Sequence, residues 1–316
     1  MALLEVQHIS KQFSNGLLIN DISFEQQALQ KIAIAGESGA GKTTLLKMIS
    51  GYVQPDSGVI LFDGKRVLGP EEKLLPGHPK MGYLSQYFEL LNNYRVEELI
   101  WFENKIEVSA AKTLFQICRI DHLLQRRTSQ LSGGEKQRIA LCMLLIMSPQ
   151  LLILDEPFSN LDPIHTDTLK AVLEEITERL QITCTLTSHD PHDTLSWANE
   201  ILVMKEGNII QKGTPQEIYH QPVNEYVAGL FGRYNFLKPE LAALFGIEAN
   251  EKNVMIRPEE FSINATTKNG VKGTIQKISF RGSFYEAEVL VEDVKIVVRM
   301  MRNEGKFGEE IWVNVN

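Results

Sequence analysis

Apolar residues follow one pattern through the first two thirds of the chain. Short continuous apolar runs, at 31–35 and 151–154, alternate with stretches such as 169–180 in which apolar residues recur every three or four positions. Buried parallel strands have continuous apolar sequences, whereas helices bury a stripe at three- and four-residue spacing. The pattern therefore predicts a mainly parallel sheet flanked by helices.

Two further stretches add to this sheet. Residues 3–30 alternate between apolar and polar side chains on either side of a turn at 14–16, which predicts two antiparallel strands. Residues 95–125 are more polar and have helical spacing, so we expect a helical insertion that lies apart from the main sheet. A helix is also predicted from 131 to 147, ended by Ser148-Pro149.

The pattern changes near residue 235. Alternation returns at 285–291, 294–298 and 311–315, and helical spacing ends by about residue 246. We predict an α/β P-loop nucleotide-hydrolase cassette over residues 1–235, with a mixed sheet core, an antiparallel β subdomain and a helical subdomain at about 87–150. A small all-β barrel at 236–316 follows it.

A glycine-rich segment joins the predicted strand at 31–35 to the helix that follows it, and it matches G-x-x-x-x-G-K-[ST]. Glycines let backbone N–H groups turn toward anionic oxygens, and the helix adds the positive end of its dipole. Lys42 would bind the β- and γ-phosphates of ATP, and the Thr43 hydroxyl would ligate Mg²⁺. The candidate nucleotide-binding residues of this loop are Gly36, Glu37, Ser38, Gly39, Ala40, Gly41, Lys42, Thr43 and Thr44.

Two carboxylates end the apolar run at 151–154. Asp155 is a candidate Mg²⁺ ligand, and Glu156, whose side chain points elsewhere, is a candidate general base for hydrolysis. His189 follows a predicted strand at 182–187, on the edge where α/β sheets place their ligands, although a structural role is the alternative. Phe13 is either a core aromatic residue or one that stacks on a purine ring.

The composition argues against a nucleic-acid-binding protein, a membrane-spanning protein and a secreted protein. A net charge of −8 with no basic stripe argues against nucleic acid as a partner. No apolar run approaches the ~20 residues of a membrane helix, and the first residues lack the features of a signal peptide. The three cysteines, without CxxC spacing, suit buried thiols in a reducing cytoplasm. We therefore expect a cytoplasmic protein whose link to a membrane runs through a partner.

The segment Leu-Ser-Gly-Gly-Glu at 131–135 resembles the signature motif of the ATP-binding cassette of ABC transporters. A phosphate loop occurs in many nucleotide hydrolases, but the loop and this signature in the right order are specific, and the resemblance covers about residues 3–230. It implies Phe13 as the adenine-stacking aromatic residue, Gln86 as the Q-loop glutamine and Mg²⁺ ligand, and His189 as the switch histidine. It also implies that Asp155 and Glu156 form the Walker B pair and that 159–162 is the D-loop.

In this family the signature acts on ATP bound to a second cassette. The resemblance therefore implies a homodimer in which Ser132, Gly133 and Gly134 close over the γ-phosphate held by the partner. The two glycines would let backbone amides approach that phosphate, and the helix that follows would aim its positive end at it. ATP would then hold two subunits together, and hydrolysis would release them.

The last third resembles the importer subgroup of this family, which handles maltose-type sugars, polyamines, ferric iron, sulfate and molybdate. Residues 213–236 resemble its linker, and Ile-Arg-Pro-Glu-Glu at 256–260 with the strands that follow resembles its C-terminal TOBE-type barrel. This implies an ATPase subunit that drives an inner-membrane permease, lies peripherally on the cytoplasmic face and imports a solute captured by a separate binding protein. Residues 87–94 depart from the usual importer sequence where the family contacts its permease.

Several alternatives stay open at this point. The chain could be an exporter ATPase whose tail serves assembly, or a soluble cassette ATPase that acts on ribosomes or DNA. The single cassette, the acidic charge and the lack of a long coiled-coil insertion argue against the latter. The C-terminal barrel is either a dimer contact or a small-molecule sensor. The transported substrate cannot be read from these residues.

Overall fold

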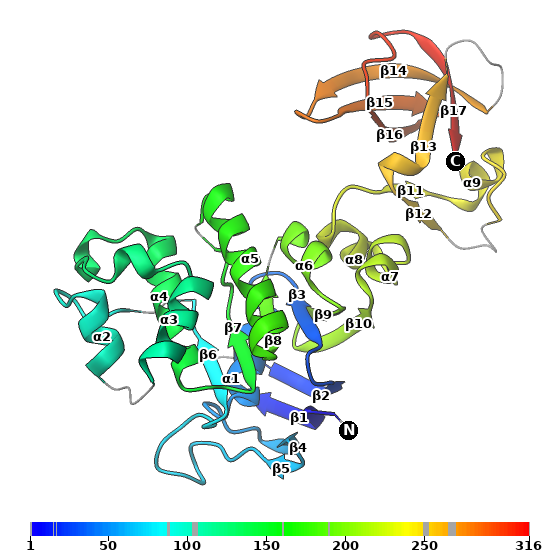
Figure 1. Ribbon diagram of the computed structural model, residues 1–316. Helices are drawn as coiled ribbons and strands as arrows, with labels where there is room; N and C mark the ends of the chain where they lie inside the picture. Colours follow the sequence, from blue (N-terminus) through cyan, green and yellow to red (C-terminus); the bar gives the residue numbers. More distant parts are fainter. Residues whose placement is uncertain are drawn as a thin grey trace. The chain divides into compact units, whose positions relative to one another are not determined.

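The structure is a computed structural model that describes residues 2–14, 16, 18–86, 89–102, 107–159, 161–188, 190–248, 253–264 and 270–315. Backbone contacts divide the chain into two compact units, Met1–Pro215 and Gln216–Asn316. Figure 1 shows both along the chain, and each is described by itself below. No helix in the described ranges is both long and apolar enough to cross a bilayer.

The first unit is built on a six-stranded sheet of order β10-β9-β3-β8-β7-β6. Five strands run parallel, and only β10 pairs antiparallel, with β9. The central strands are almost entirely buried on both faces, which explains their continuous apolar sequences. The strands are β3 (Lys31–Ala35), β6 (Met81–Leu84), β7 (Leu151–Leu154), β8 (Thr183–Ser188), β9 (Glu200–Lys205) and β10 (Asn208–Gly213).

A second, antiparallel sheet packs against the first. Its order is β2-β1-β4-β5, and its strands are β1 (Leu4–Gln12), β2 (Leu18–Gln26), β4 (Ser57–Phe62) and β5 (Lys65–Arg66). One apolar core joins both sheets and the first helix, since Leu4, Ile34 and Leu46 belong to the same buried cluster. The glycine-rich loop, whose Ala40 belongs to this cluster, is therefore anchored in a core that both sheets share.

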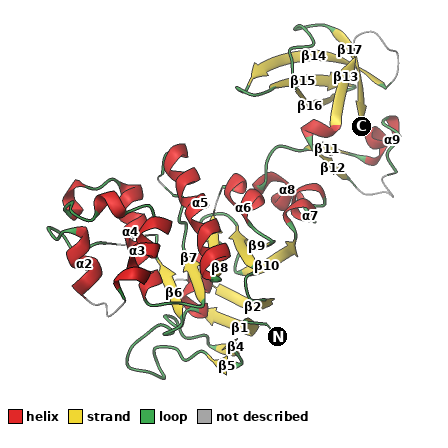
Figure 2. Cartoon of the chain, viewed as in Figure 1, coloured by secondary structure: helices red, strands yellow, loops and turns green. Residues whose placement is uncertain are grey.

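The helices of this unit follow the predicted order, except that the last of them was not predicted. They are α1 (Lys42–Ile49), α2 (Val96–Phe102), α3 (Val108–Ile117), α4 (Gly133–Ile146), α5 (Pro163–Leu180) and α6 (Pro191–Trp197), with 3₁₀ turns at Asp121–Leu123 and Thr128–Gln130. Asp162 caps α5 by accepting a hydrogen bond from the backbone N–H of His165, and Pro163 occupies the first turn. Figure 2 shows α2, α3 and α4 gathered to one side of the strands, and all three lie within the residues predicted as the helical subdomain, about 87–150.

The second unit is mainly antiparallel β structure. Its five-stranded sheet has the order β13-β17-β14-β15-β16, with strands β13 (Phe261–Asn264), β14 (Val271–Phe280), β15 (Tyr285–Val291), β16 (Val294–Met300) and β17 (Glu310–Val315). A smaller pair, β11 (Asn235–Leu237) and β12 (Val254–Ile256), precedes it with the short helices α7 (Pro215–His220), α8 (Glu225–Leu230) and α9 (Pro239–Leu244) and the 3₁₀ turn Pro258–Glu260. The predicted fold class, an α/β cassette followed by a small all-β domain, is confirmed.

Arg257, which follows β12, forms hydrogen bonds to the helical segment at the beginning of this second unit. Its side chain is 2% exposed, and its guanidinium donates to four backbone carbonyls between 219 and 233. The distances from Arg257 to the carbonyl oxygens are 3.0 Å (Tyr219), 2.9 Å (Ala228), 3.2 Å (Gly232) and 3.1 Å (Arg233). The predicted linker is thus bound to the same compact unit as the β-sheet. The domain boundary at 235/236 stays a prediction, because the compact units describe backbone contacts and not functional domains.

Candidate nucleotide-binding site

The glycine-rich loop runs from the end of β3 into α1. Gly39 and Gly41 have φ of 85° and 100°, in the left-handed region that glycine adopts without a steric cost. Gly41 is the N-cap of α1 and brings no side chain to cap its backbone N–H groups. These donors and the positive end of the helix therefore face the loop.

A cavity of about 370 Å³ opens at this loop. Its polar lining combines the loop with two residues from other parts of the sheet edge, Gln86 after β6 and Glu156 after β7. The lining residues are Ser38, Gly39, Gly41, Lys42, Thr43, Thr44, Gln86 and Glu156. The sequence predicted every one of them as a site residue.

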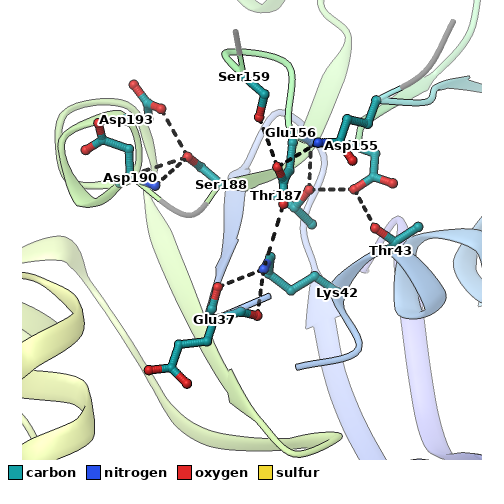
Figure 3. A network of polar contacts seen from close by, with 12 residues as sticks. Glu37, Lys42, Thr43, Asp155, Glu156, Ser159, Thr187, Ser188, Asp190 and Asp193 are labelled. Carbon is teal, nitrogen blue, oxygen red and sulfur yellow. Dashed lines mark hydrogen bonds and ion pairs between the residues drawn. The ribbon is translucent and has the colours of Figure 1, made fainter. Parts of the chain in front are cut away.

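Figure 3 shows Lys42 between Glu37 and Glu156 in the polar network. Its ammonium group donates to the backbone oxygens of Gly36 (2.7 Å) and Glu37 (3.0 Å) and is 3.9 Å from Oε1 of Glu156. Burial lowers the pKa of Lys42, while the charges of Glu156 and Asp155 oppose that shift. A buried cation held between a glycine-rich loop and two carboxylates is suited to bind anionic oxygens.

Asp155 is 3% exposed and accepts hydrogen bonds from three neighbouring strands or helices. Its Oδ1 accepts from Thr43 (3.0 Å) in α1 and from Thr187 (2.9 Å) in β8, and its Oδ2 accepts from Tyr83 (3.1 Å) in β6. Burial, followed by the charge of Asp155, raises the pKa of Tyr83, so this hydroxyl stays protonated and donates. The carboxylate is fixed beside the Thr43 hydroxyl.

Glu156 follows directly but turns to another side, because its backbone is left-handed with φ of 47°. Its backbone N–H donates to Thr187 Oγ1 (2.9 Å), and its Oε2 accepts from Gln86 (3.1 Å) and Ser159 (2.9 Å). A non-glycine residue in this conformation is uncommon. The predicted difference in direction between the two carboxylates is what the structure shows.

The other predicted residues lie elsewhere or outside the described ranges. Ser132 caps α4 through a reciprocal pair, since its hydroxyl accepts from the backbone of Glu135 (3.3 Å) and its own N–H donates to the Glu135 carboxylate (2.7 Å). No residue of 131–135 is among the described residues that line the cavity. Phe13 is half-buried, with the Lys11 ammonium group 5.7 Å from its ring centre. His189 lies outside the described residues.

Two residues that hold the Asp155 carboxylate escaped the sequence analysis: Thr187 and Tyr83. Each is an ordinary strand residue by pattern, and its role depends on which strands are neighbours in the sheet. A further signal was readable, because Ser132 and Glu135 have the S-x-x-E spacing of a capping box. That spacing places the start of α4 at Gly133.

Fold and site together define a P-loop nucleotide hydrolase. The ABC transporter domain family matches residues 19–159, and the TOBE domain family matches residues 254–316. The chain is 33% identical to the sulfate/thiosulfate import ATP-binding protein CysA of Synechocystis sp., over 95% of this chain and 88% of that protein. It is 31% identical to the spermidine/putrescine import ATP-binding protein PotA of Spiroplasma citri, over 94% of this chain and 90% of that protein.

A solved structure gives the same assignment for the fold. The structure of cbiO1 from Clostridium perfringens, part of the ABC transporter complex cbiONQ, superposes with a TM-score of 0.59 at 28% identity, covering 69% of this chain and 90% of that one. The chain belongs to the ATP-binding subunits of ABC transporters, in the import branch that carries a C-terminal TOBE domain. It is an ATPase subunit, and the prediction made from the signature motif is confirmed.

Proposed function

We propose that the cavity at the start of α1 binds ATP with Mg²⁺ and hydrolyses it with Glu156 as the general base. The observation that carries this proposal is the hydrogen-bonded network around Lys42, which brings the loop and both carboxylates to one edge of the sheet. Within it Lys42 and the loop amides bind phosphate oxygens, and Phe13 stacks on the adenine.

The oxygen atoms beside the cavity suit magnesium. Mg²⁺ is usually held by one or two protein oxygens together with substrate phosphates rather than by a cluster of charged side chains. The Thr43 hydroxyl and the Asp155 carboxylate are 3.0 Å apart, and Gln86 supplies an amide oxygen at the same cavity. These three side chains would hold the ion, which neutralises charge on the phosphates when bound.

Glu156 is placed to take a proton from the attacking water. Hydrogen bonds from Gln86 and Ser159 fix its Oε2, and its backbone N–H is held by Thr187, so the carboxylate keeps one orientation. Proton transfer to a positioned carboxylate contributes about 10²–10⁴-fold to a rate. The family resemblance assigns His189 the role of the switch histidine, and this assignment is part of the proposal.

Two such subunits would join around ATP. Ser132, Gly133 and Gly134 lie at the beginning of α4 and are absent from the described cavity lining of their own chain. This arrangement supports a role in trans, in which they close over the γ-phosphate held by a second copy. The functional domains are then 1–235, with its helical subdomain at about 87–150, and 236–316.

In the cell this dimer would drive a membrane permease from the cytoplasmic face of the inner membrane, with a solute-binding protein delivering the substrate. The relatives are named for sulfate and thiosulfate, which are anions, and for spermidine and putrescine, which are cations. Similar identities to both support the view that the ATPase subunit does not define the charge of the solute. Specificity therefore belongs to the permease and the binding protein.

The test is a pull-down of the tagged Glu156→Gln variant from its native membrane in detergent, with and without ATP and Mg²⁺. We expect a permease and its binding protein to be recovered with MgATP. The Lys42→Met variant serves as a control that should not form the ATP-dependent complex. Recovery of ribosomal proteins or DNA without a membrane subunit would refute the transport function, and recovery of a permease without any binding protein would point to export.

A further inference from the structure

The first turn of α4 packs directly against the first turn of α5. A Cβ atom added to Gly134 would lie 2.8 Å from Cδ2 of His165 and within 3.3 Å of two further carbons of that side chain. The same construction at Gly133 meets nothing within 4 Å. Gly134 is buried, whereas Gly133 is exposed, so the two adjacent glycines have different surroundings. The absence of a side chain at 134 is what allows the imidazole of His165 to lie there.

His165 also holds the aspartate that ends the loop after Glu156. Its backbone N–H donates to Oδ1 of Asp162 (3.0 Å), and its ring Nδ1 is 2.6 Å from Oδ2 of the same carboxylate. An ionised carboxylate only accepts, so Nδ1 carries the hydrogen in this pair. These bonds, the backbone one first, lower the pKa of the Asp162 carboxyl group. One side chain thus contacts Asp162 on one side and Gly134 on the other.

The segment between Glu156 and Asp162 is joined to α4 at a second point. The side-chain amide of Gln137, one turn into α4 and 6% exposed, donates to the backbone oxygen of Pro157. At the start of the same segment, Ser159 donates to the Glu156 carboxylate at 2.9 Å. Hydrogen bonds and packing contacts therefore link the predicted base to the start of α4 within one chain.

We propose that His165 is a positioning residue that sets the beginning of α4 relative to the loop carrying Asp162. It would hold Ser132 and Gly134 at the place from which they reach the ATP of a second subunit. The role rests on the proposed function of these residues in trans. Glycine at 134 is then required by the imidazole packed against it in its own chain, and not only by a phosphate that approaches from the partner.

A double-mutant cycle on the full-length protein tests this coupling. The variants are Gly134→Ala, His165→Ala and the double variant, with kcat and KM for ATP measured by phosphate release, and with MgATP-dependent dimerisation measured by light scattering in a Glu156→Gln background. Exposed His122→Ala in the helical insertion is the matched control for loss of a histidine. Each variant is first checked for a native unfolding transition.

We expect Gly134→Ala to lower kcat by about tenfold or more, because the new methyl group collides with the ring, while KM for ATP changes little. Removing the ring relieves that collision, so the double variant should be at least as active as Gly134→Ala. If its loss equals the product of the two single losses, His165 and Gly134 are not coupled and the proposal is wrong. Wild-type protein that neither hydrolyses ATP nor dimerises would instead refute the proposed function.

Two single substitutions separate packing from hydrogen bonding. His165→Asn retains an amide donor within reach of Asp162, whereas His165→Leu retains bulk but has no donor. We expect kcat and dimerisation to be closer to wild type in His165→Asn than in His165→Leu. The reverse order, or equal values, would remove the Asp162 bond from the positioning role.

Discussion

Thr187 is the residue whose replacement tests the geometry of the site most directly. It lies at the penultimate position of β8, is completely buried, and contacts both carboxylate residues at once. Its hydroxyl donates to Asp155 Oδ1 at 2.9 Å and accepts from the backbone N–H of Glu156 at 2.9 Å. The substitution Thr187→Val keeps the branched shape, removes both bonds and leaves the Glu156 N–H without this acceptor.

The magnitude follows from these two bonds. A hydrogen bond to a charged group contributes about 1.5–3 kcal/mol, and a hydrogen bond between neutral groups contributes about 0.5–1.5 kcal/mol. Asp155 Oδ1 still accepts from Thr43, which places the expected loss of unfolding free energy at about 2–5 kcal/mol. Because Glu156 also loses the contact that fixes its backbone, we expect kcat to fall about 10- to 100-fold.

Thr185→Val is the matched control. Thr185 is two residues earlier on the same face of β8, is equally buried, and donates to the side-chain oxygen of Gln26 at 2.7 Å, away from the site. It should lose about 1–3 kcal/mol of stability with an unchanged kcat. Urea unfolding of both variants measures the loss of stability, and phosphate release measures kcat. A wild-type kcat in Thr187→Val, or an equal fall in both variants, would refute the assignment of Thr187 to the site.

The other predictions concern the base, the second unit and a thiol. Glu156→Gln should lower turnover about 10²–10⁴-fold and leave ATP affinity unchanged; comparable turnover would exclude Glu156 as the base. Arg257→Lys should destabilise the second unit by about 2–4 kcal/mol, seen in calorimetry, because one ammonium group cannot replace four guanidinium contacts. Burial raises the pKa of Cys184 to about 12, so the folded state keeps a proton that the unfolded state releases, and stability should fall as the pH rises from about 9 toward 12. In urea unfolding at pH 8 and pH 10, Cys184→Ala should show a smaller fall than wild type, and equal falls would contradict this.

The sequence was sufficient for the parts of the site that lie on one continuous segment. The strand, glycine-rich loop and helix at 31–49 are contiguous, and the chemistry proposed for Lys42 and Thr43 follows from their place in that segment. Asp155 and Glu156 were also identified, because a buried strand that ends in two carboxylates is unusual. At these positions the apolar pattern that predicts the strand also places the polar residues at its end.

The remaining part depends on which strands are neighbours. Thr187 and Tyr83 meet Asp155 only because β8 and β6 flank β7, and no periodicity within either strand specifies that order. The contact of His165 with Gly134 likewise depends on the packing of two helices whose first turns are about thirty residues apart in the chain. The spacing of Ser132 and Glu135, in contrast, is a local signal that would have moved the predicted helix start from 131 to Gly133, where α4 begins.

The contacts of Arg257 have a consequence for exchanging C-terminal domains between related transporters. A chimaera joined after residue 235 would combine this chain's carbonyls at 219–233 with a foreign arginine, or with none. A chimaera joined before residue 216 would carry the guanidinium and its four acceptors together from one parent. Recombination between such genes should therefore succeed more often at the earlier junction, because that junction keeps all four hydrogen bonds within the segment from one parent.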